Sequence, residues 1–223
     1  MKAMILAAGR GDRLRPLTDQ TPKPLLKVGG RGLIEHHLVR LADAGFSEVV
    51  INLGWLGEQI HQALGDGQAF GLQIQYSQEP PGALETAGGI IHALPLLGKQ
   101  PFAAIAADIL CDFDYAELRA PEAPTLASLV MVDNPPHHQQ GDFALDAGRL
   151  ALAGGNRLTF SGIAVYHPAL FAGLEPGRRA LRPVFEAAIT AGRLAGIHHR
   201  GYWSDIGTPE RLAEAQHSPM VSR

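Results

Sequence analysis

Residues 6–18 read LAAGRGDRLRPLT, and residues 22–25 read PKPL. This stretch follows a short apolar run that predicts a buried first strand. The small residues Ala8, Gly9 and Gly11 allow backbone N–H groups to approach a phosphate closely. Several cationic side chains follow within a few positions and can bind phosphate oxygens; they are Arg10, Arg13, Arg15 and Lys23. We interpret the stretch as a loop that holds a polyphosphate at the end of the first strand.

Two better-known phosphate-binding motifs do not fit this loop. A P-loop requires a lysine directly after a pair of spaced glycines, and no lysine stands there. A dinucleotide fingerprint requires a third glycine and an immediate helix. Prolines at 16, 22 and 24 disfavour such a helix. The loop therefore belongs to another kind of polyphosphate site.

The ordered residues of this loop resemble the sugar-1-phosphate nucleotidylyltransferases, whose pattern is L-A-A-G-x-G-x-R-x-x-P-L-T followed by P-K-P. The resemblance implies transfer of a nucleotidyl group to a sugar 1-phosphate, with Arg13 and Lys23 as the catalytic cations. Arg13 would hold the β- and γ-phosphates, and Lys23 would neutralise the α-phosphate. The nucleotide-binding residues that it implies in this loop are Ala8, Gly9, Gly11, Asp12, Arg13 and Lys23.

Composition narrows the class of protein and its partners. The chain has 223 residues, of which 46% are hydrophobic, so a large core is available. Its net charge is −3 and it has no basic block, which argues against nucleic acid as a partner. No stretch has the length of a membrane span, and the single cysteine, Cys111, cannot form an internal disulfide. We expect a cytoplasmic protein that does not bind a membrane.

Strand and helix patterns alternate through the first half of the chain. This order predicts an α/β fold of the Rossmann-like, nucleotide-diphospho-sugar transferase type, with a mostly parallel sheet and helices on both faces. Ligands bind such sheets beyond the carboxyl ends of the strands, which places Asp108 beside the phosphate loop. The expected strands cover residues 2–7, 48–53, 72–76 and 102–107, and the expected helices lie near 33–41, 57–64 and 84–93.

The second half is less regular. Residues 125–132 and 159–166 predict strands, and residues 178–191 and 209–216 predict helices. Residues 134–157 are rich in Pro, Gly and His and predict hairpins or a lid-like loop. We expect a single domain over residues 1–223, with a nucleotide-binding half of about 1–110 and a sugar-phosphate-binding half of about 111–223.

Nucleotidyl transfer usually needs Mg²⁺, which binds one or two carboxylates. Asp108, at the end of a predicted central strand, suits this role. The resemblance implies a second ligand, Asp205, within a W-x-D-x-G-T-P segment that residues 203–209 match. The family often has Gly-Asp at the first of these positions, where this chain has Ala107-Asp108.

Residues 79–89 read EPPGALETAGG and also resemble the family, which holds the nucleobase and then the sugar with such a loop. The resemblance implies that Glu79 and Gly82 contact the nucleotide and that Glu85 contacts the sugar side. An ordinary turn followed by an early-helix carboxylate, which the helix dipole favours, explains these residues equally well.

The sugar phosphate is expected in the second half, where the resemblance implies contacts at Gly141, Asn156 and Gly162. The lysine that many family members use for the sugar phosphate has no counterpart here. Three arginines are candidates to replace it, namely Arg157, Arg179 and Arg182.

Three His-His pairs, at residues 36–37, 137–138 and 198–199, do not predict a metal centre. Adjacent side chains point in different directions on a helix or a strand, so a pair does not form one chelating face. We expect these histidines to be surface or partly packed residues.

Within the family, the short chain, the ALETAGG segment and RLTFSGI at residues 157–163 resemble the uridylyltransferases of cell-wall recycling. That resemblance implies UTP and N-acetylmuramate 1-phosphate as substrates and a monomer or small homo-oligomer. The alternatives are a mannose- or glucose-1-phosphate nucleotidylyltransferase that uses GTP or dTTP, and a small-molecule cytidylyltransferase. Alternatives of another class are a catalytically silent regulatory protein that binds nucleotide sugars, and an interaction module that binds no nucleotide.

Overall fold

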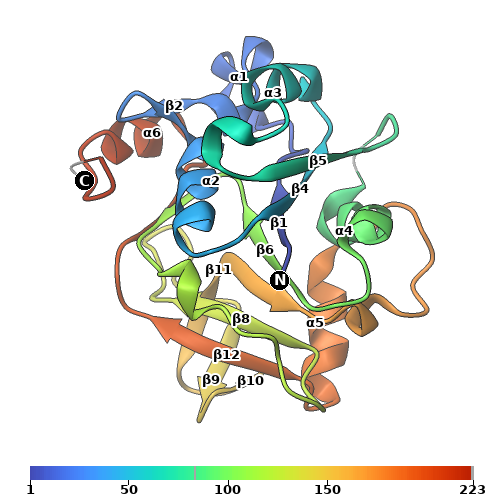
Figure 1. Ribbon diagram of the computed structural model, residues 1–223. Helices are drawn as coiled ribbons and strands as arrows, with labels where there is room; N and C mark the ends of the chain where they lie inside the picture. Colours follow the sequence, from blue (N-terminus) through green and yellow to red (C-terminus); the bar gives the residue numbers. More distant parts are fainter. Residues whose placement is uncertain (83, 222–223) are drawn as a thin grey trace.

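A nine-stranded sheet organises the chain, which a computed structural model describes over residues 1–82 and 84–221 (Figure 1). Four strands of the first half form one end of the sheet, and five strands of the second half form the other. The order of the strands is β5 (Gln73–Gln78), β4 (Glu48–Leu53), β1 (Ala3–Leu6), β6 (Phe102–Ala106), β11 (Arg157–Tyr166), β8 (Ala127–Val132), β12 (Leu194–His199), β10 (Arg149–Ala151) and β9 (Phe143–Asp146).

The first half has the predicted βαβ order. Strand β1 pairs in parallel with β4 and β6, and β4 pairs in parallel with β5. The helices that connect these strands are α2 (Leu33–Asp43), α3 (Gly57–Leu64) and α4 (Glu85–Leu97). Helix α2 ends just before Gly45, whose φ of 83° is the left-handed conformation that glycine adopts readily. The predicted strands and helices of residues 2–107 are confirmed, with shifts of a few residues at their ends.

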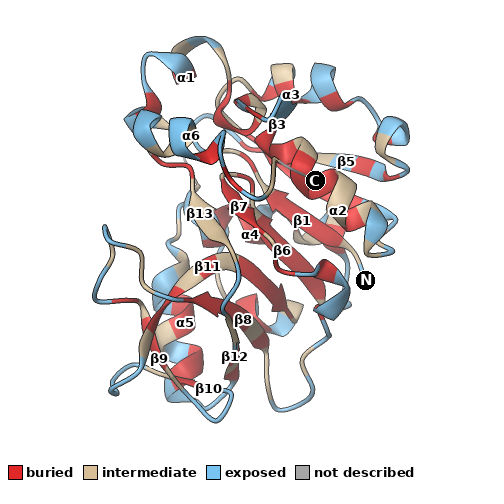
Figure 2. Cartoon of the chain, turned by 90° about the vertical axis from the view of Figure 1, so that its left-hand side faces the viewer, coloured by how far each residue is buried: buried red, intermediate tan, exposed pale blue. Residues whose placement is uncertain are grey.

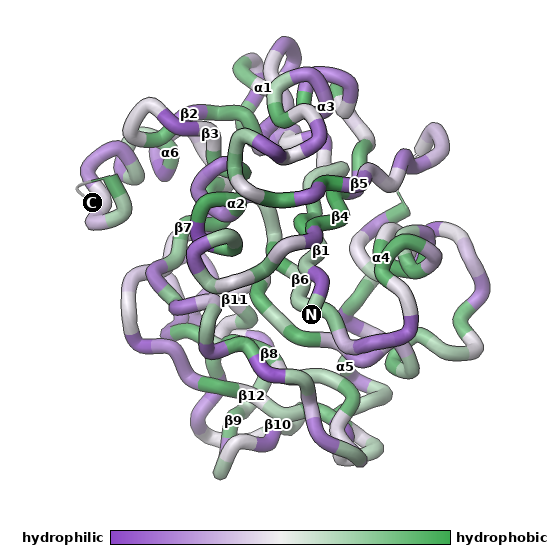
Figure 3. Tube along the Cα trace, in the orientation of Figure 1, coloured by the Kyte–Doolittle hydropathy of each residue, from purple (hydrophilic) through white to green (hydrophobic). Residues whose placement is uncertain are grey.

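Helices cover both faces of the sheet, as expected. Along β1, Ala3 and Ile5 pack with α2 and α3, whereas Met4 points to the other face and packs with α4 and α5 (Leu181–Thr190). This alternation follows from the two-residue period of a strand. Figure 2 shows the central strands as buried, and Figure 3 shows hydrophobic residues concentrated along them.

The prediction of a mostly parallel sheet is wrong, because the second half makes the sheet mixed. Strand β11 runs antiparallel to both of its neighbours, β6 and β8. Strands β9 and β10 follow each other through a short turn at Ala147 and Gly148, and a connection of that length permits only antiparallel pairing. Only β12, which follows helix α5, returns parallel to its neighbour β8.

The second half of the sheet also closes on itself. Strand β9 pairs with β10 at the edge and with β11 as well, so five strands form a ring. The β8–β11 register shifts between Phe160 and Ala164, and Gly162, with φ 85°, lies inside this irregularity. A bulge of this kind bends a strand, which lets β11 belong both to the open half and to the ring.

Shorter elements complete the molecule. The predicted hairpin in residues 134–157 is formed by β9 and β10, and the predicted terminal helix is α6 (Pro209–Ala215). Strand β7 (Ile109–Cys111) pairs with β13 (Trp203–Asp205). Further short elements are helix α1 (Leu17–Gln20), the two-residue strands β2 (Lys27–Val28) and β3 (Arg31–Gly32), and several 3-10 turns. Over the described residues, no helix is both long enough and apolar enough to cross a membrane.

His37 makes the stability of this fold sensitive to acid. It is buried on α2, its Nδ1 lies 2.7 Å from the Tyr115 hydroxyl, and burial and then the nearby charge of Arg40 lower its pKa to about 3. The unfolded chain then binds a proton below a pH of about 6.5 that the folded chain does not. We predict that the free energy of unfolding falls as the pH decreases from about 6.5 toward 3, by up to about 1.4 kcal/mol per pH unit from this residue.

Urea unfolding at a series of pH values measures this slope. His37→Gln is expected to reduce the slope between about pH 6.5 and pH 4, whereas the exposed His61→Gln is the matched control and should keep it. An unchanged slope in His37→Gln would contradict the prediction.

Candidate active site

A cleft of about 890 Å³ opens beyond the carboxyl ends of β1 and β6. Residues from the loop after β1 line one wall, and residues from β9, β11 and α5 line the opposite wall. The structure brings ten of the predicted site residues to this cleft: Ala8, Gly9, Gly11, Asp12, Arg13, Lys23, Glu79, Glu85, Asp108 and Gly162.

Local packing explains the glycine and threonine of the phosphate loop. Gly11 has φ 72°, and a Cβ there would lie 3.0 Å from Thr18 and 3.2 Å from Lys23. The Thr18 hydroxyl donates a hydrogen bond to the Gly11 carbonyl (2.9 Å). The loop therefore folds back on itself, and this close contact requires glycine. No atom lies within 4 Å of the Cβ position of Gly9, in contrast to Gly11.

The four cations of the loop divide into two groups. Arg10 lies over the ring of Trp55 at 4.5 Å and close to Asp12, and Arg15 pairs with Asp19 at 2.8 Å. Arg13 and Lys23 line the cleft instead. These are the two cations to which the resemblance assigns catalytic roles.

Lys23 and Asp108 form an ion pair at the cleft. The Lys23 side chain is only 11% exposed, and it donates a hydrogen bond to Asp108 Oδ2. Strand β6 ends at Ala106 and Asp108 stands two residues later, as expected. The backbone N–H of the intervening Ala107 donates a hydrogen bond to the Leu6 carbonyl (3.1 Å). Pairing of β1 with β6 thus places Asp108 beside the phosphate loop, where Lys23 reaches it.

Asn52, at the end of β4, is a cleft residue that sequence reasoning missed. Its Oδ1 accepts a hydrogen bond from the Ala7 backbone (2.7 Å), and its Nδ2 donates to Glu79 Oε1 (2.7 Å). Both Asn52 and Glu79 are buried. The sequence did offer a signal for Asn52: it is an amide residue near the carboxyl end of a predicted strand, and that strand neighbours the one that leads into the phosphate loop. Asn52 fixes the start of the phosphate loop and the orientation of Glu79.

Asp205 lies next to the cleft, in a smaller hollow of about 330 Å³ that it lines together with Asp108. The β7–β13 ladder places Asp205 opposite Ile109, and the Ile206 backbone donates to the Asp108 carbonyl (2.8 Å). Asp205 Oδ1 is buried and forms an ion pair with the Arg211 guanidinium, and His137 Nε2 lies 3.0 Å from it. Two carboxylates that line one hollow supply the oxygen ligands that a divalent cation takes.

The histidines do not form a centre with one another. His137 lies beside Asp205 and His138 beside Asp142, while His198 and His199 contact Asp133 and Asp112. In the part of the chain described, Cys111, Asp112 and His199 offer three possible ligand atoms that lie within 4.8 Å of one another. None of these lines the cleft, and burial raises the pKa of the Cys111 thiol to about 11.

The segment of residues 79–89 borders the cleft through Glu79, Leu84, Glu85 and Thr86, but Gly82 is not among the lining residues. Glu85 Oε1 accepts a hydrogen bond from Arg178 Nε (2.6 Å), and Glu85 has φ 59°, which is uncommon for a residue other than glycine. Ala83, in the middle of the segment, lies outside the described residues.

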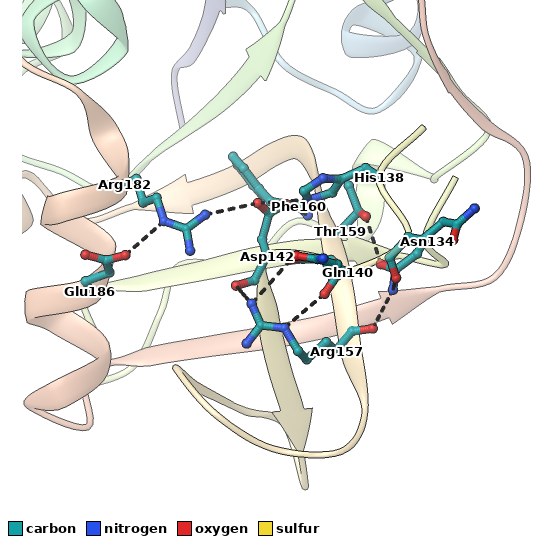
Figure 4. Close-up of polar contacts among 11 residues, drawn as sticks. Asn134, His138, Gln140, Asp142, Arg157, Thr159, Phe160, Arg182 and Glu186 are labelled. Atoms are coloured by element: carbon teal, nitrogen blue, oxygen red, sulfur yellow. Dashed lines mark hydrogen bonds and ion pairs between the residues drawn. The ribbon is translucent and has the colours of Figure 1, made fainter. Parts of the chain in front are cut away.

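Among the predicted sugar-side residues, Gly162 lines the cleft and Gly141 and Asn156 do not. Asn156 is exposed in the connection that leads into β11. Gly141 has φ 59°, and a Cβ there would lie 2.9 Å from the Leu158 carbonyl oxygen. Its neighbour Asp142 lines the cleft instead, with Oδ2 accepting a hydrogen bond from the Phe160 backbone (2.8 Å; Figure 4).

The three arginines considered for the sugar phosphate have different environments. Arg157 donates hydrogen bonds to the backbone carbonyls of residues 140, 142 and 152 and lies outside the cleft. Arg179 also lies outside it. Arg182, near the start of α5, lines the cleft (Figure 4). The positions of the three side chains relative to the cleft come from the tertiary structure.

Comparison with known proteins identifies the class to which this fold and site belong. The nucleotidyl transferase family matches residues 2–146, and the chain belongs to that family. The resemblance found in the sequence is thereby confirmed. The family typically uses a divalent metal.

Two relatives carry a more specific name. The chain is 54% identical to the N-acetylmuramate alpha-1-phosphate uridylyltransferase of Neisseria meningitidis serogroup B, over 97% of each chain. It is 34% identical to a protein of the same name from Caulobacter vibrioides, over 96% of this chain and 97% of that protein. A putative glucose-1-phosphate thymidylyltransferase structure from Bacillus anthracis has the same fold, with a TM-score of 0.85 at 21% identity over 100% of this chain and 99% of that one.

The two hydrogen bonds of Asn52 can be tested separately. Asn52→Ala removes both and leaves the buried Ala7 N–H unpaired, so we expect a loss of about 1–3 kcal/mol in unfolding free energy. Asn52→Asp keeps an acceptor for Ala7 but places a second carboxylate beside Glu79. Urea unfolding and the KM for the nucleotide measure the two effects.

We expect Asn52→Asp to raise the KM for the nucleotide because it displaces Glu79. The exposed Gln68→Ala is the control for both measurements. Wild-type stability in Asn52→Ala would mean that the Ala7 contact does not hold the loop.

Proposed function

We propose that this protein transfers the uridylyl group of UTP to N-acetylmuramate 1-phosphate and releases pyrophosphate. One structural observation carries the proposal: the Lys23–Asp108 pair meets the phosphate loop in a cleft whose opposite wall comes from the second half of the chain. The 54% identical relative, matched over nearly its whole length, supports the choice of UTP and of the sugar.

The reaction is an in-line displacement at the α-phosphorus. An oxygen of the sugar phosphate attacks, a new phosphorus–oxygen bond forms, and the bond to the leaving pyrophosphate breaks. Catalysis of this kind relies on positioning and on charges aimed at the transition state. Lys23 neutralises the α-phosphate, Arg13 holds the β- and γ-phosphates, and the backbone of residues 8–11 holds the chain of phosphates, with Asp12 at its edge.

Asp108 and Asp205 hold Mg²⁺ in this proposal. When bound, the ion offsets the negative charge on the α-phosphate and on the departing pyrophosphate. Lys23, paired with Asp108, brings a fixed positive charge to the same point of the cleft.

The two halves of the single domain divide the substrates. Residues of about 1–110 bind the nucleotide, with Glu79 near the base or ribose. Residues of about 111–223 bind the sugar phosphate, with Gly162 on that side and Glu85 across from it, whereas Gly82, Gly141 and Asn156 do not line the cleft. We assign the reaction to the cytoplasm, where UTP is made.

A screen of four nucleoside triphosphates against several sugar 1-phosphates tests the reaction. Pyrophosphate release should be fastest with UTP and N-acetylmuramate 1-phosphate and should require a divalent metal. Faster release with GTP and mannose 1-phosphate would favour the guanylyltransferase alternative. Nucleotide binding without any pyrophosphate release would favour the regulatory alternative.

Arg13 has a matched control two residues away. Arg13→Ala removes a cation that lines the cleft, so we expect kcat/KM to fall by about 10²–10³. Arg15→Ala removes a cation that pairs with Asp19 outside the cleft, and it should leave kcat/KM unchanged. Steady-state pyrophosphate release measures both, and equal rates for the two variants would remove Arg13 from the phosphate site.

A further inference from the structure

Arg182 is a cation of the cleft to which the reaction itself assigns no role. Three cationic side chains line the cleft within the described residues, namely Arg13, Lys23 and Arg182. The first two lie on the phosphate loop and its continuation. Arg182 lies on the opposite wall, in the first turn of α5, next to β9 and β11 (Figure 4). Its charge therefore faces a different part of the substrates.

Two carboxylates hold the Arg182 guanidinium in place. Glu186, one helical turn later, accepts a hydrogen bond from Nε (2.9 Å), and Asp142 Oδ1 lies 3.6 Å from Nη1, beyond hydrogen-bond distance (Figure 4). Among the described residues, no hydrogen bond occupies Nη2. An arginine has five N–H donors and can bind carboxylates along two edges, so one edge is anchored and another is available to a ligand.

Asp142 is itself engaged by other groups. Its Oδ2 accepts a hydrogen bond from the Phe160 backbone, and its Oδ1 lies 3.3 Å from His138 Nε2. One Asp142 oxygen is thus occupied by the Phe160 N–H and the other lies 3.6 Å from Arg182, so Asp142 does not saturate Arg182. The Arg182 side chain is 57% exposed, which leaves its guanidinium accessible from the cleft.

Aromatic rings border the same position. The Arg182 guanidinium carbon lies 5.6 Å from the centroid of the Phe143 ring. Phe160 and Phe185, which stack edge to face at 5.4 Å, also line the cleft. These rings give the position an apolar border beside the charge of Arg182. A ligand for this position has an apolar part beside an anionic group.

The sugar of the proposed function has such a group. N-acetylmuramate differs from N-acetylglucosamine by a lactyl ether, which carries a methyl group and a carboxylate on the ring carbon two bonds from C1. The phosphate on C1 must lie at the α-phosphorus, beside Lys23. A sugar ring that extends from there toward the wall of β9, β11 and α5 would bring the lactyl group to Arg182.

We propose that Arg182 binds the lactyl carboxylate and thereby selects N-acetylmuramate 1-phosphate over sugar 1-phosphates that lack it. This inference rests on the proposed function. The planar guanidinium matches a carboxylate through two parallel hydrogen bonds. The sugar phosphate is the other anion in the cleft, but the charged groups that contact Arg182 are Asp142 and Glu186, and neither belongs to the phosphate loop.

The experiment compares two sugar 1-phosphates as substrates of the enzyme, each with UTP as the nucleotide. The ratio of kcat/KM for N-acetylmuramate 1-phosphate to kcat/KM for N-acetylglucosamine 1-phosphate is measured in the wild type, Arg182→Gln and Arg182→Lys. We expect the ratio to fall about 10- to 100-fold in Arg182→Gln, because the neutral amide loses a charge-assisted pair. Lysine keeps the positive charge but lacks the planar guanidinium, so the ratio for Arg182→Lys should lie between those for the wild type and Arg182→Gln.

Arg149→Gln is the matched control. Arg149 lies on β10 outside the cleft and donates to the Gly192 carbonyl, so this variant loses the same charge and should keep the wild-type ratio. Thermal melting shows whether each variant is folded.

Three results would overturn the inference. An equal fall of kcat/KM with both substrates in Arg182→Gln would place Arg182 on the shared phosphate or ring, and wild-type kcat/KM with both substrates would remove Arg182 from recognition of the sugar. A wild type that uses UTP but not N-acetylmuramate 1-phosphate would overturn the proposed function, and this inference with it. The wild-type measurement alone separates that failure from the other two.

Discussion

The ion pair between Lys23 and Asp108 is the contact on which the cleft depends. A lysine side chain that is 11% exposed needs a partner, since an unpaired charge removed from water is strongly destabilising. The pair joins the loop after β1 to the end of β6. Its geometry also explains Gly11, because the stem of Lys23 occupies the space that a Cβ on Gly11 would need.

Asn52 provides a second tether for the same loop, from the strand on the other side of β1. It connects the Ala7 backbone with Glu79, so the beginning of the phosphate loop and a carboxylate beyond β5 are held by one buried amide. With Lys23 bound to the end of β6, the loop is fixed from both neighbouring strands. A polyphosphate site held in this way needs little reorganisation before the reaction.

The first half of the fold is predictable because its signals are local. Helices between successive strands favour parallel pairing, and this pairing places Asp108 beside the phosphate loop. The second half depends on contacts between distant residues: β7 and β13 have three residues each, and nothing in their sequences indicates that they pair. The same limit applies to the site, because Asn52, Asp142 and Arg182 reach the cleft from three separate segments. Motif patterns therefore identify the reaction more readily than the residues that distinguish one sugar from another.

The mixed sheet has a functional consequence. Strand β11 pairs with β6 only through residues 163–166, so its earlier residues extend beyond the carboxyl end of β6. Gly162 marks the bend, and Phe160 beyond it lies on the wall that faces the phosphate loop. A parallel strand at this position would end level with β6 and leave that side of the cleft open. The antiparallel strand and its ring supply the wall of the cleft that faces the phosphate loop.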